Sequence, residues 1–304
     1  MRMRRFGSLL VMACLGSSSA RAAEVAVLKS SDVPAWRSAL DSLRRTAASH
    51  NLSEFDLKND RAEAERVLAG LKGKTAVLVA LGPLAAQAAR ELAPEIPLVF
   101  AMIQDPARLN LLGLAGVSGV AFSVPVKNRL AAFRMVNPKG VRVGVIYSAE
   151  GGGRLVQEAQ KAVGILRLAV VDRPVASEKE IPEALRSMLK GDQAVDALWI
   201  PPDPILLGDE TRRYILSETL KAQKPVYTSL AALVAEGALV ASGPDQGSIG
   251  EQIVELVSRL AGSEKAAKID MLIPRGELII NKKIADKIKV EIPADALKAA
   301  SKVF

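Results

Sequence analysis

One stretch, Thr75-Ala-Val-Leu-Val-Ala-Leu81, is apolar at almost every position and stops at Gly82-Pro83. A short, continuous apolar run is typical of a strand buried on both faces, as in a parallel sheet. Proline favours the first position of a helix, so a helix is predicted to begin at Pro83. This strand-turn-helix unit is the pattern from which α/β proteins are built.

The same alternation extends in both directions from this unit. The apolar runs and the helical segments between them predict strands over 25–28, 52–58, 75–81, 97–102 and 116–120, with helices over 34–48 and 60–71 and from 83. A second series follows. It predicts strands over 141–147, 165–171, 194–200, 225–228 and 238–242, with helices over 154–163, 178–189 and 209–223 and a short helix before the last strand. Two successive α/β units with parallel sheets covered on both faces fit these patterns.

The end of the chain differs from both series. A long helix is predicted over 248–260, extended chain over 269–280, and two short helices after that. A tail that returns after the second unit indicates more than one crossing between two lobes, which allows hinge closure.

The composition excludes several kinds of chemistry. The 304 residues include one His and one Cys, so the chain cannot form a His/Cys zinc site or an internal disulfide. His50 lies in what is predicted to be the end of a surface helix, which gives no sign of a catalytic base. No P-loop, G-x-G-x-x-G or G-x-S-x-G motif is present in the right context. We therefore expect no enzyme activity, no cofactor and no metal.

The net charge of +8 is concentrated at the N-terminus. Residues 1–22 hold four Arg and no acid, which leaves 37 Lys+Arg against 33 Asp+Glu, or +4, for the rest. Without a stripe of Arg and aromatic residues, that charge does not predict nucleic-acid binding.

Residues 1–22 have the features of a secretory signal. Met1 to Arg5 is positively charged, Leu9 to Leu15 is apolar, and Ala20-Arg21-Ala22 is a small-x-small cleavage site. The sequence before Cys14 also resembles a lipoprotein box, in which case Cys14 would be lipidated and would anchor the chain to the membrane. Both alternatives place the mature protein outside the cytoplasm, in the periplasm or as an extracytoplasmic lipoprotein.

The candidate ligand-binding residues follow the predicted strands. Ligands of open parallel sheets bind at the carboxyl ends of the strands, where helix N-termini offer free N–H groups. The candidates are Ser30, Ser31, Gly82, Pro83, Gln104, Asp105, Tyr147, Ser148, Asp203, Thr228 and Ser229. They supply hydroxyls, amides and carboxylates but no matched nucleophile and base. Capping and turn formation are the competing interpretations for Ser31, Gly82-Pro83, Asp105 and Asp203.

Several ordered segments resemble ABC transporter substrate-binding proteins of the tryptophan-binding type. In the first unit they are residues 77–89, 96–101, 104–106 and 116–120; in the second they are 137–147, 196–203 and 224–229, followed by 278–281 and 292–300. The resemblance implies a periplasmic-binding-protein type I fold, with two Rossmann-like lobes joined by about three segments. We expect a signal peptide at 1–22, one lobe from 23–121 plus 243–265, and the other from 122–242 plus 266–304. Gly82-Pro83 stands where many members have Gly followed by Thr or Ser, which removes one hydroxyl.

The resemblance also implies a function. We expect the exported solute-binding component of an ABC importer, which captures a small polar, amino-acid-like ligand in the cleft and delivers it to a permease in the inner membrane. Two alternatives stay open on the residues: a ligand sensor that acts on a receptor, and a secreted hydrolase that uses carboxylates in the cleft.

Overall fold

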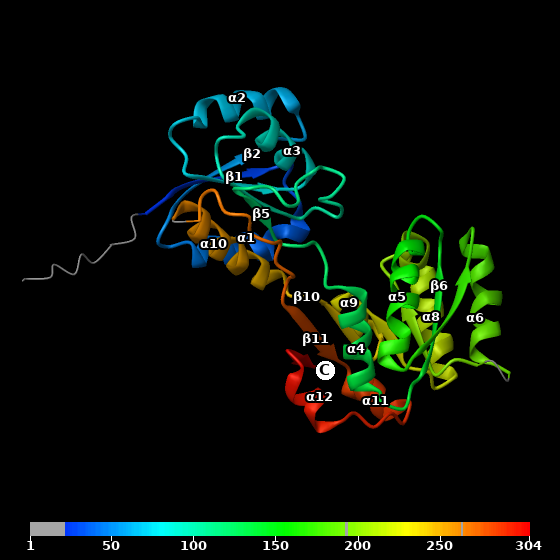
Figure 1. Ribbon diagram of the computed structural model, residues 1–304. Coiled ribbons are helices and arrows are strands. Elements are labelled where there is room, and N and C mark those ends of the chain that lie inside the picture. Colours follow the sequence, from blue (N-terminus) through cyan, green and yellow to red (C-terminus); the bar gives the residue numbers. More distant parts are fainter. Residues whose placement is uncertain (1–21, 192–193, 263) are drawn as a thin grey trace, which may run out of the picture.

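The computed structural model describes residues 22–191, 194–262 and 264–304. They form two lobes, each with its own sheet, joined by a narrow region (Figure 1). The expected signal peptide, except for its last residue, and Cys14 lie outside the described residues. None of the described helices combines the length and apolar character needed to cross a bilayer.

The first lobe contains a parallel five-stranded sheet in the order β2-β1-β3-β4-β5. Its strands are β1 (Glu24–Lys29), β2 (Asn51–Asp56), β3 (Val77–Leu81), β4 (Leu98–Ala101) and β5 (Val117–Gly119). Its helices are α1 (Arg37–Thr46), which follows a 3-10 turn at Pro34–Trp36, then α2 (Arg61–Leu71), α3 (Pro83–Leu92) and α10 (Gln246–Ala261). All five residues of β3 are buried, as its continuous apolar sequence predicted.

Helices cover both faces of this sheet. Val77, Val79 and Leu81 pack toward α1 and α10, whereas Leu78 and Ala80 pack toward α2 and α3. Gly250 lets α10 approach α1 closely, because a Cβ atom there would lie 2.5 Å from the backbone nitrogen of Leu43. The expected fold class, parallel sheets flanked by helices, is confirmed.

The second lobe contains a seven-stranded sheet in the order β12-β11-β10-β9-β8-β6-β7, in which only the β10–β11 pair is antiparallel. Its strands are β6 (Arg142–Tyr147), β7 (Ala169–Pro174), β8 (Ala197–Ile200), β9 (Val226–Thr228), β10 (Val240–Pro244), β11 (Gly276–Ile280) and β12 (Lys302–Val303). Its helices are α4 (Val126–Val136), α5 (Gly153–Leu166), α6 (Ile181–Leu189), α7 (Pro204–Leu207), α8 (Asp209–Lys221), α9 (Ala231–Glu236), α11 (Lys282–Lys287) and α12 (Ala294–Ala299), with a 3-10 turn at Glu178–Glu180.

Several elements of this lobe differ from the sequence prediction, among them the short helix α7, which was not predicted. Helix α4 was not predicted, because Lys127, Asn128 and Arg129 interrupt its apolar pattern. Helix α5 continues to Leu166 and ends at Arg167 in the left-handed region (φ 52°), so β7 begins later than expected. The short strand β12 was also missed.

The described chain passes between the lobes at three places: from β5 to α4, from β10 to α10, and before β11. One detail differs from the expected division of the lobes. Leu272 bridges Val120, and Gly116 N–H donates to the carbonyl oxygen of Ala267, so residues 267–272 line the edge of the first sheet instead of belonging to the second lobe.

Candidate functional site

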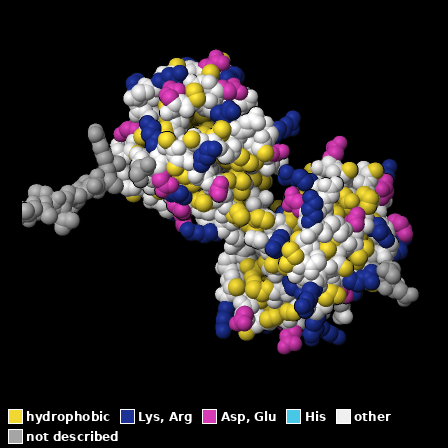
Figure 2. Space-filling model, in the orientation of Figure 1, with side chains coloured by type: hydrophobic (Ala, Val, Ile, Leu, Met, Phe, Trp, Pro, Cys, Tyr) yellow, Lys and Arg dark blue, Asp and Glu magenta, His cyan; other side chains and the backbone are white. Residues whose placement is uncertain are grey.

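The carboxyl ends of the parallel strands in both lobes face the region between the lobes. β5 ends and leads into α4 of the other lobe, and β10 ends and leads into α10 of the first lobe, so both sheets present these ends to the crossings. Figure 2 shows a hollow between the two lobes on the face in view. The candidate residues, which follow these strands, therefore lie at the ends of the two sheets that face each other.

Ser30 and Gly82 meet at the start of α3. Ser30 is 3% exposed, and its Oγ accepts a hydrogen bond from the backbone N–H of Ala85 at 3.0 Å. Gly82 has φ +91°, and a Cβ atom there would lie 2.7 Å from Ser30 Oγ and 2.8 Å from Trp36. Ser30 thus supplies the cap that the glycine lacks. Pro83, at the first position of α3, is exposed toward solvent.

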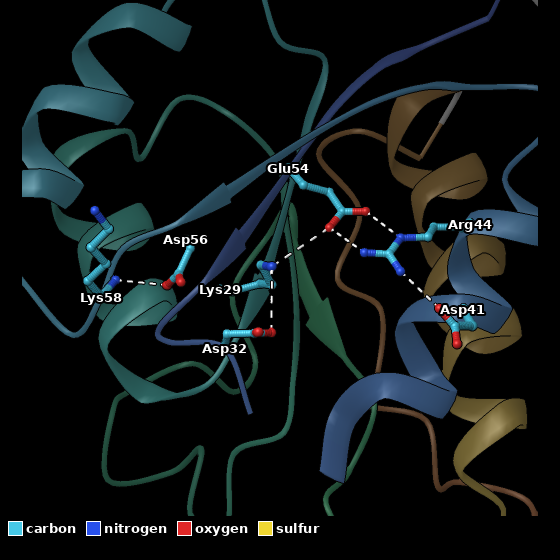
Figure 3. A network of polar contacts seen from close by, with 7 residues as sticks. All are labelled: Lys29, Asp32, Asp41, Arg44, Glu54, Asp56 and Lys58. Atoms are coloured by element: carbon cyan, nitrogen blue, oxygen red, sulfur yellow. Dashed lines mark hydrogen bonds and ion pairs between the residues drawn. The ribbon is translucent and has the colours of Figure 1, made fainter. Parts of the chain in front are cut away.

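Ser31 and Asp32 do not cap the helix that follows them, which has no side-chain cap. Ser31 is half-buried. Asp32 instead pairs with Lys29 at 3.9 Å, within a network of charges in which Glu54 binds Arg44 at 2.7 Å (Figure 3). The hydrogen bond from Arg44 holds the pKa of Glu54 below its ordinary value. This network joins β1 and β2 to α1 and leaves Asp32 exposed.

Gln104 and Asp105 follow β4 and are both exposed. Asp105 Oδ1 accepts a hydrogen bond from Arg108 N–H at 3.1 Å, which makes it a turn residue. Between β4 and this turn, Met102 is held at φ 61°, a region uncommon for residues with a side chain.

In the second lobe, Asp203 is fully buried and joins two loops. Its carboxylate accepts hydrogen bonds from Ser148 N–H at 2.6 Å, from Ser148 Oγ at 2.9 Å and from Ile205 N–H at 3.1 Å. Ser148 Oγ in turn accepts from Gly151 N–H at 3.0 Å. Asp203 is 0% exposed, and these hydrogen bonds let its carboxylate hold the β6–α5 loop in place.

Tyr147, at the end of β6, is bonded to the neighbouring strand β7. Its OH donates to Asp172 Oδ2 on β7 at 3.1 Å. Partial burial, and then the carboxylate of Asp172, raise the pKa of Tyr147. Its ring packs with the core under α4 and α5. These contacts fix the position of the Tyr147 side chain.

Thr228 and Ser229 end the central strand β9. Thr228 is 0% exposed and its Oγ1 accepts from Leu230 N–H at 3.2 Å, so it shapes the turn into α9. Ser229 is half-buried. The neighbouring residue on β10 is Gly243. A side chain at position 243 would not fit, because its Cβ atom would lie 2.6 Å from the carbonyl oxygen of Ser229.

A pocket of about 800 Å³ lies at the ends of β6, β7 and β8. It is lined by Ser148, Ala149, Glu150, Gly151, Pro174, Val175, Ala176, Glu180, Pro204 and Ile205. The polar part of its lining comes from the β6–α5 loop, which Asp203 holds in place, and from the carboxylates of Glu150 and Glu180. Of the predicted residues, the structure brings Ser148 to this pocket and keeps Asp203 directly behind it.

Sequence reasoning missed Arg129, which is 3% exposed in α4. Its Nε atom is buried without a hydrogen-bond partner among the described residues. The signal was present in the spacing: Val126, Leu130 and Phe133 form the apolar face of a helix, and Arg129 falls on that face. Within the described part of the chain there is no group of three or more His, Cys, Asp or Glu residues suited to a metal ion.

Two α/β lobes joined by three crossings form the same fold as a solved substrate-binding protein. The family model described as ABC transporter substrate binding protein matches residues 24–304. The chain belongs to this family.

Known relatives are similar in sequence and in fold. A tyrosine-binding protein of Clostridioides difficile (strain R20291) is 23% identical over 235 residues, which cover 74% of this chain and 66% of that protein, just under two thirds of its length. The ligand-free, open structure of a substrate-binding protein with adhesive properties from Clostridium difficile has a TM-score of 0.77 at 18% identity and covers 92% of this chain and 99% of the other. An ABC domain in complex with L-Trp from Streptococcus pneumonia has a TM-score of 0.59 at 23% identity and covers 93% and 100%.

Proposed function

We propose that this protein captures an amino acid, with aromatic amino acids as the first candidates, and delivers it to the permease of an ABC importer. The observation that carries the proposal is the placement of polar strand ends from two lobes on opposing surfaces, joined by three crossings. A ligand that contacts both surfaces favours the closed arrangement of the lobes, because only closure brings both sets of groups to it. The names of the tyrosine-binding relative and of the L-Trp complex support the ligand class.

Direct binding measurements test this function. The chain from residue 23 onward is titrated with each of the twenty amino acids by calorimetry, and its melting temperature is measured with and without each one. A ligand that binds only the folded state at 100 times its Kd stabilises the protein by about 2.7 kcal/mol. We expect such a rise with at least one aromatic amino acid. Binding of a sugar or a nucleoside, with no response to any amino acid, would contradict the proposal.

We further propose that the protein works in the periplasm after export. The predicted signal at residues 1–22 supports export, and Cys14 offers a lipid anchor as the alternative to a freely diffusing mature protein. Mass spectrometry of the protein from its native cell distinguishes the two. Cleavage after Ala22 gives a chain without cysteine, whereas a lipoprotein begins at an acylated Cys14. An intact Met1 in the cytoplasm would contradict export.

A further inference from the structure

We propose that Arg129, with the hydroxyl groups of Ser242 and Ser229, forms the site that binds the carboxylate of the ligand. This inference rests on the proposed amino-acid ligand and adds a residue that none of the strand ends supplies. It follows from three observations: an unpartnered buried guanidinium, its level along the second lobe, and two unpartnered hydroxyls at the same level of the sheet.

The first observation is the isolation of the guanidinium. Arg129 is 97% buried, and its side chain has no hydrogen bond and no ion pair within 4.0 Å among the described residues. Glu158 on α5 is the acidic residue whose charge affects the pKa of Arg129, but its ion pair is with Arg154, at 3.9 Å. Burial lowers the pKa of Arg129. A buried charge without a partner is costly, so its persistence needs a reason beyond stability.

The second observation is the level of Arg129 along the sheet. The ring of Phe133 stacks on that of Tyr227, with centroids 4.8 Å apart. Arg129 lies one turn before Phe133, about 6 Å nearer the crossing from β5. Ser229, the first residue after β9, lies two residues beyond Tyr227, about 6.6 Å further along the chain. Arg129 therefore lies over the carboxyl end of β9, and side chains on a helix lean toward its N-terminus, which here is the crossing between the lobes.

The third observation concerns the neighbouring strand. Val240 on β10 is in register with Tyr227, and it faces the same core under α4. Ser242, two residues further, thus points to the same face at the level of Ser229. Ser242 is 5% exposed, and neither its hydroxyl nor that of Ser229 has a hydrogen-bond partner among the described residues.

These groups are complementary to a carboxylate. A guanidinium offers two parallel N–H donors to the two oxygens, and the serine hydroxyls can donate to the remaining lone pairs. An amino acid bound here would have its carboxylate at the second lobe, next to the crossings, and its side chain free to reach the other lobe on closure.

The test uses L-tyrosine and tyramine, which differ only in the carboxylate, and the variants Arg129→Met and Arg134→Met. Arg134 lies on the same helix but donates to the carbonyl oxygen of Gly140, so it is the matched control. Calorimetry on the wild-type chain should give about 10- to 100-fold tighter binding of L-tyrosine than of tyramine. Arg129→Met should lose this discrimination, and Arg134→Met should keep it. If another amino acid binds more tightly, that amino acid and its decarboxylated amine replace the pair.

The melting temperature of the ligand-free variants completes the test. Because the guanidinium has no partner to lose, Arg129→Met should melt no lower than the wild type. Unchanged binding of L-tyrosine to Arg129→Met would overturn the carboxylate site while the proposed function stands. A much lower melting temperature, with both ligands weakened equally, would overturn it too and indicate a structural arginine. If the wild-type chain binds no amino acid, the proposed function fails first, and the site fails with it.

Discussion

At the scale of a single residue, Asp203 is a strand-end carboxylate whose hydrogen bonds hold a loop in place. Its buried oxygens accept hydrogen bonds from Ser148 and Ile205. We expect Asp203→Ala to lower the free energy of unfolding by about 3 kcal/mol, because it leaves buried donors unpaired. Urea denaturation measures this loss.

The exposed turn residue Asp105 is the control for this substitution. Asp105→Ala should change the free energy of unfolding by less than about 0.5 kcal/mol. If Asp203→Ala weakens ligand binding while unfolding at the wild-type urea concentration, Asp203 contacts the ligand, and the structural role given to it here is wrong.

Glu277 on β11 makes stability depend on pH. Partial burial, and then the nearby carboxylate of Asp245, raise the pKa of Glu277 above its ordinary value. The protonated form is therefore favoured in the folded state, and its contribution is full below the unfolded pKa of about 4.3 and is lost as pH rises through the folded pKa. Glu277→Gln should be more stable than wild type near neutral pH, and this difference should shrink at about pH 4. Denaturation at both pH values checks it; the same difference at both would contradict the shift.

The sequence predicted which residues follow the strands, but it did not predict where their side chains point or what they bond to. The rule that ligands bind at strand ends gave Ser30, Ser148 and Asp203, but it could not tell which face of the loop each side chain takes. Ser30 caps α3 and Tyr147 bonds Asp172, because nearby backbone and side-chain groups compete for the same hydroxyls. Arg129 could not be assigned to a buried face because α4 itself was not predicted. Its polar residues Lys127 and Asn128 interrupt the apolar pattern of the helix.

At the scale of elements, the loop between β6 and α5 needs its glycines. A Cβ atom on Gly151 would lie 2.6 Å from the carboxylate carbon of Asp203. We expect Gly151→Ala to destabilise the protein by about 1–3 kcal/mol, because the loop and Asp203 must move apart. Thermal denaturation measures the change.

Gly164, inside α5, provides the matched control. Nothing lies within 4 Å of a Cβ atom there, so Gly164→Ala should stabilise the helix by about 0.5–1 kcal/mol. If the two substitutions shift the melting temperature in the same direction, the tight packing of the β6–α5 loop on Asp203 is refuted.

Most elements were predictable because their sequences are either apolar throughout, as in buried strands, or apolar on one face, as in the covering helices. β3 and β8 are apolar throughout and fully buried, and the helices that cover them have clear apolar faces. The exceptions have physical causes. α4 carries an arginine on its buried face, and β12 has two residues, both exposed, so its pairing with β11 depends on tertiary contacts alone.

At the scale of the whole molecule, the two lobes and their repeated crossings followed from two α/β series and a returning tail. The position of residues 267–272 did not. They add to the edge of the first sheet through backbone hydrogen bonds such as Leu272 N–H to Gly119 O at 2.8 Å, and such bonds leave no pattern in the side chains.

Lobe closure around an amino acid is the central claim, and the distance between the lobes tests it most directly. Gln87 on α3 and Gln157 on α5 are exposed and lie on different lobes. The variant Gln87→Cys/Gln157→Cys, expressed without the leader that contains the one native cysteine, accepts two fluorophores. Single-molecule energy transfer should move to a shorter distance when saturating L-tyrosine is added, and should not move when Arg129→Met is also present. An unchanged distance while calorimetry shows the ligand bound would contradict closure.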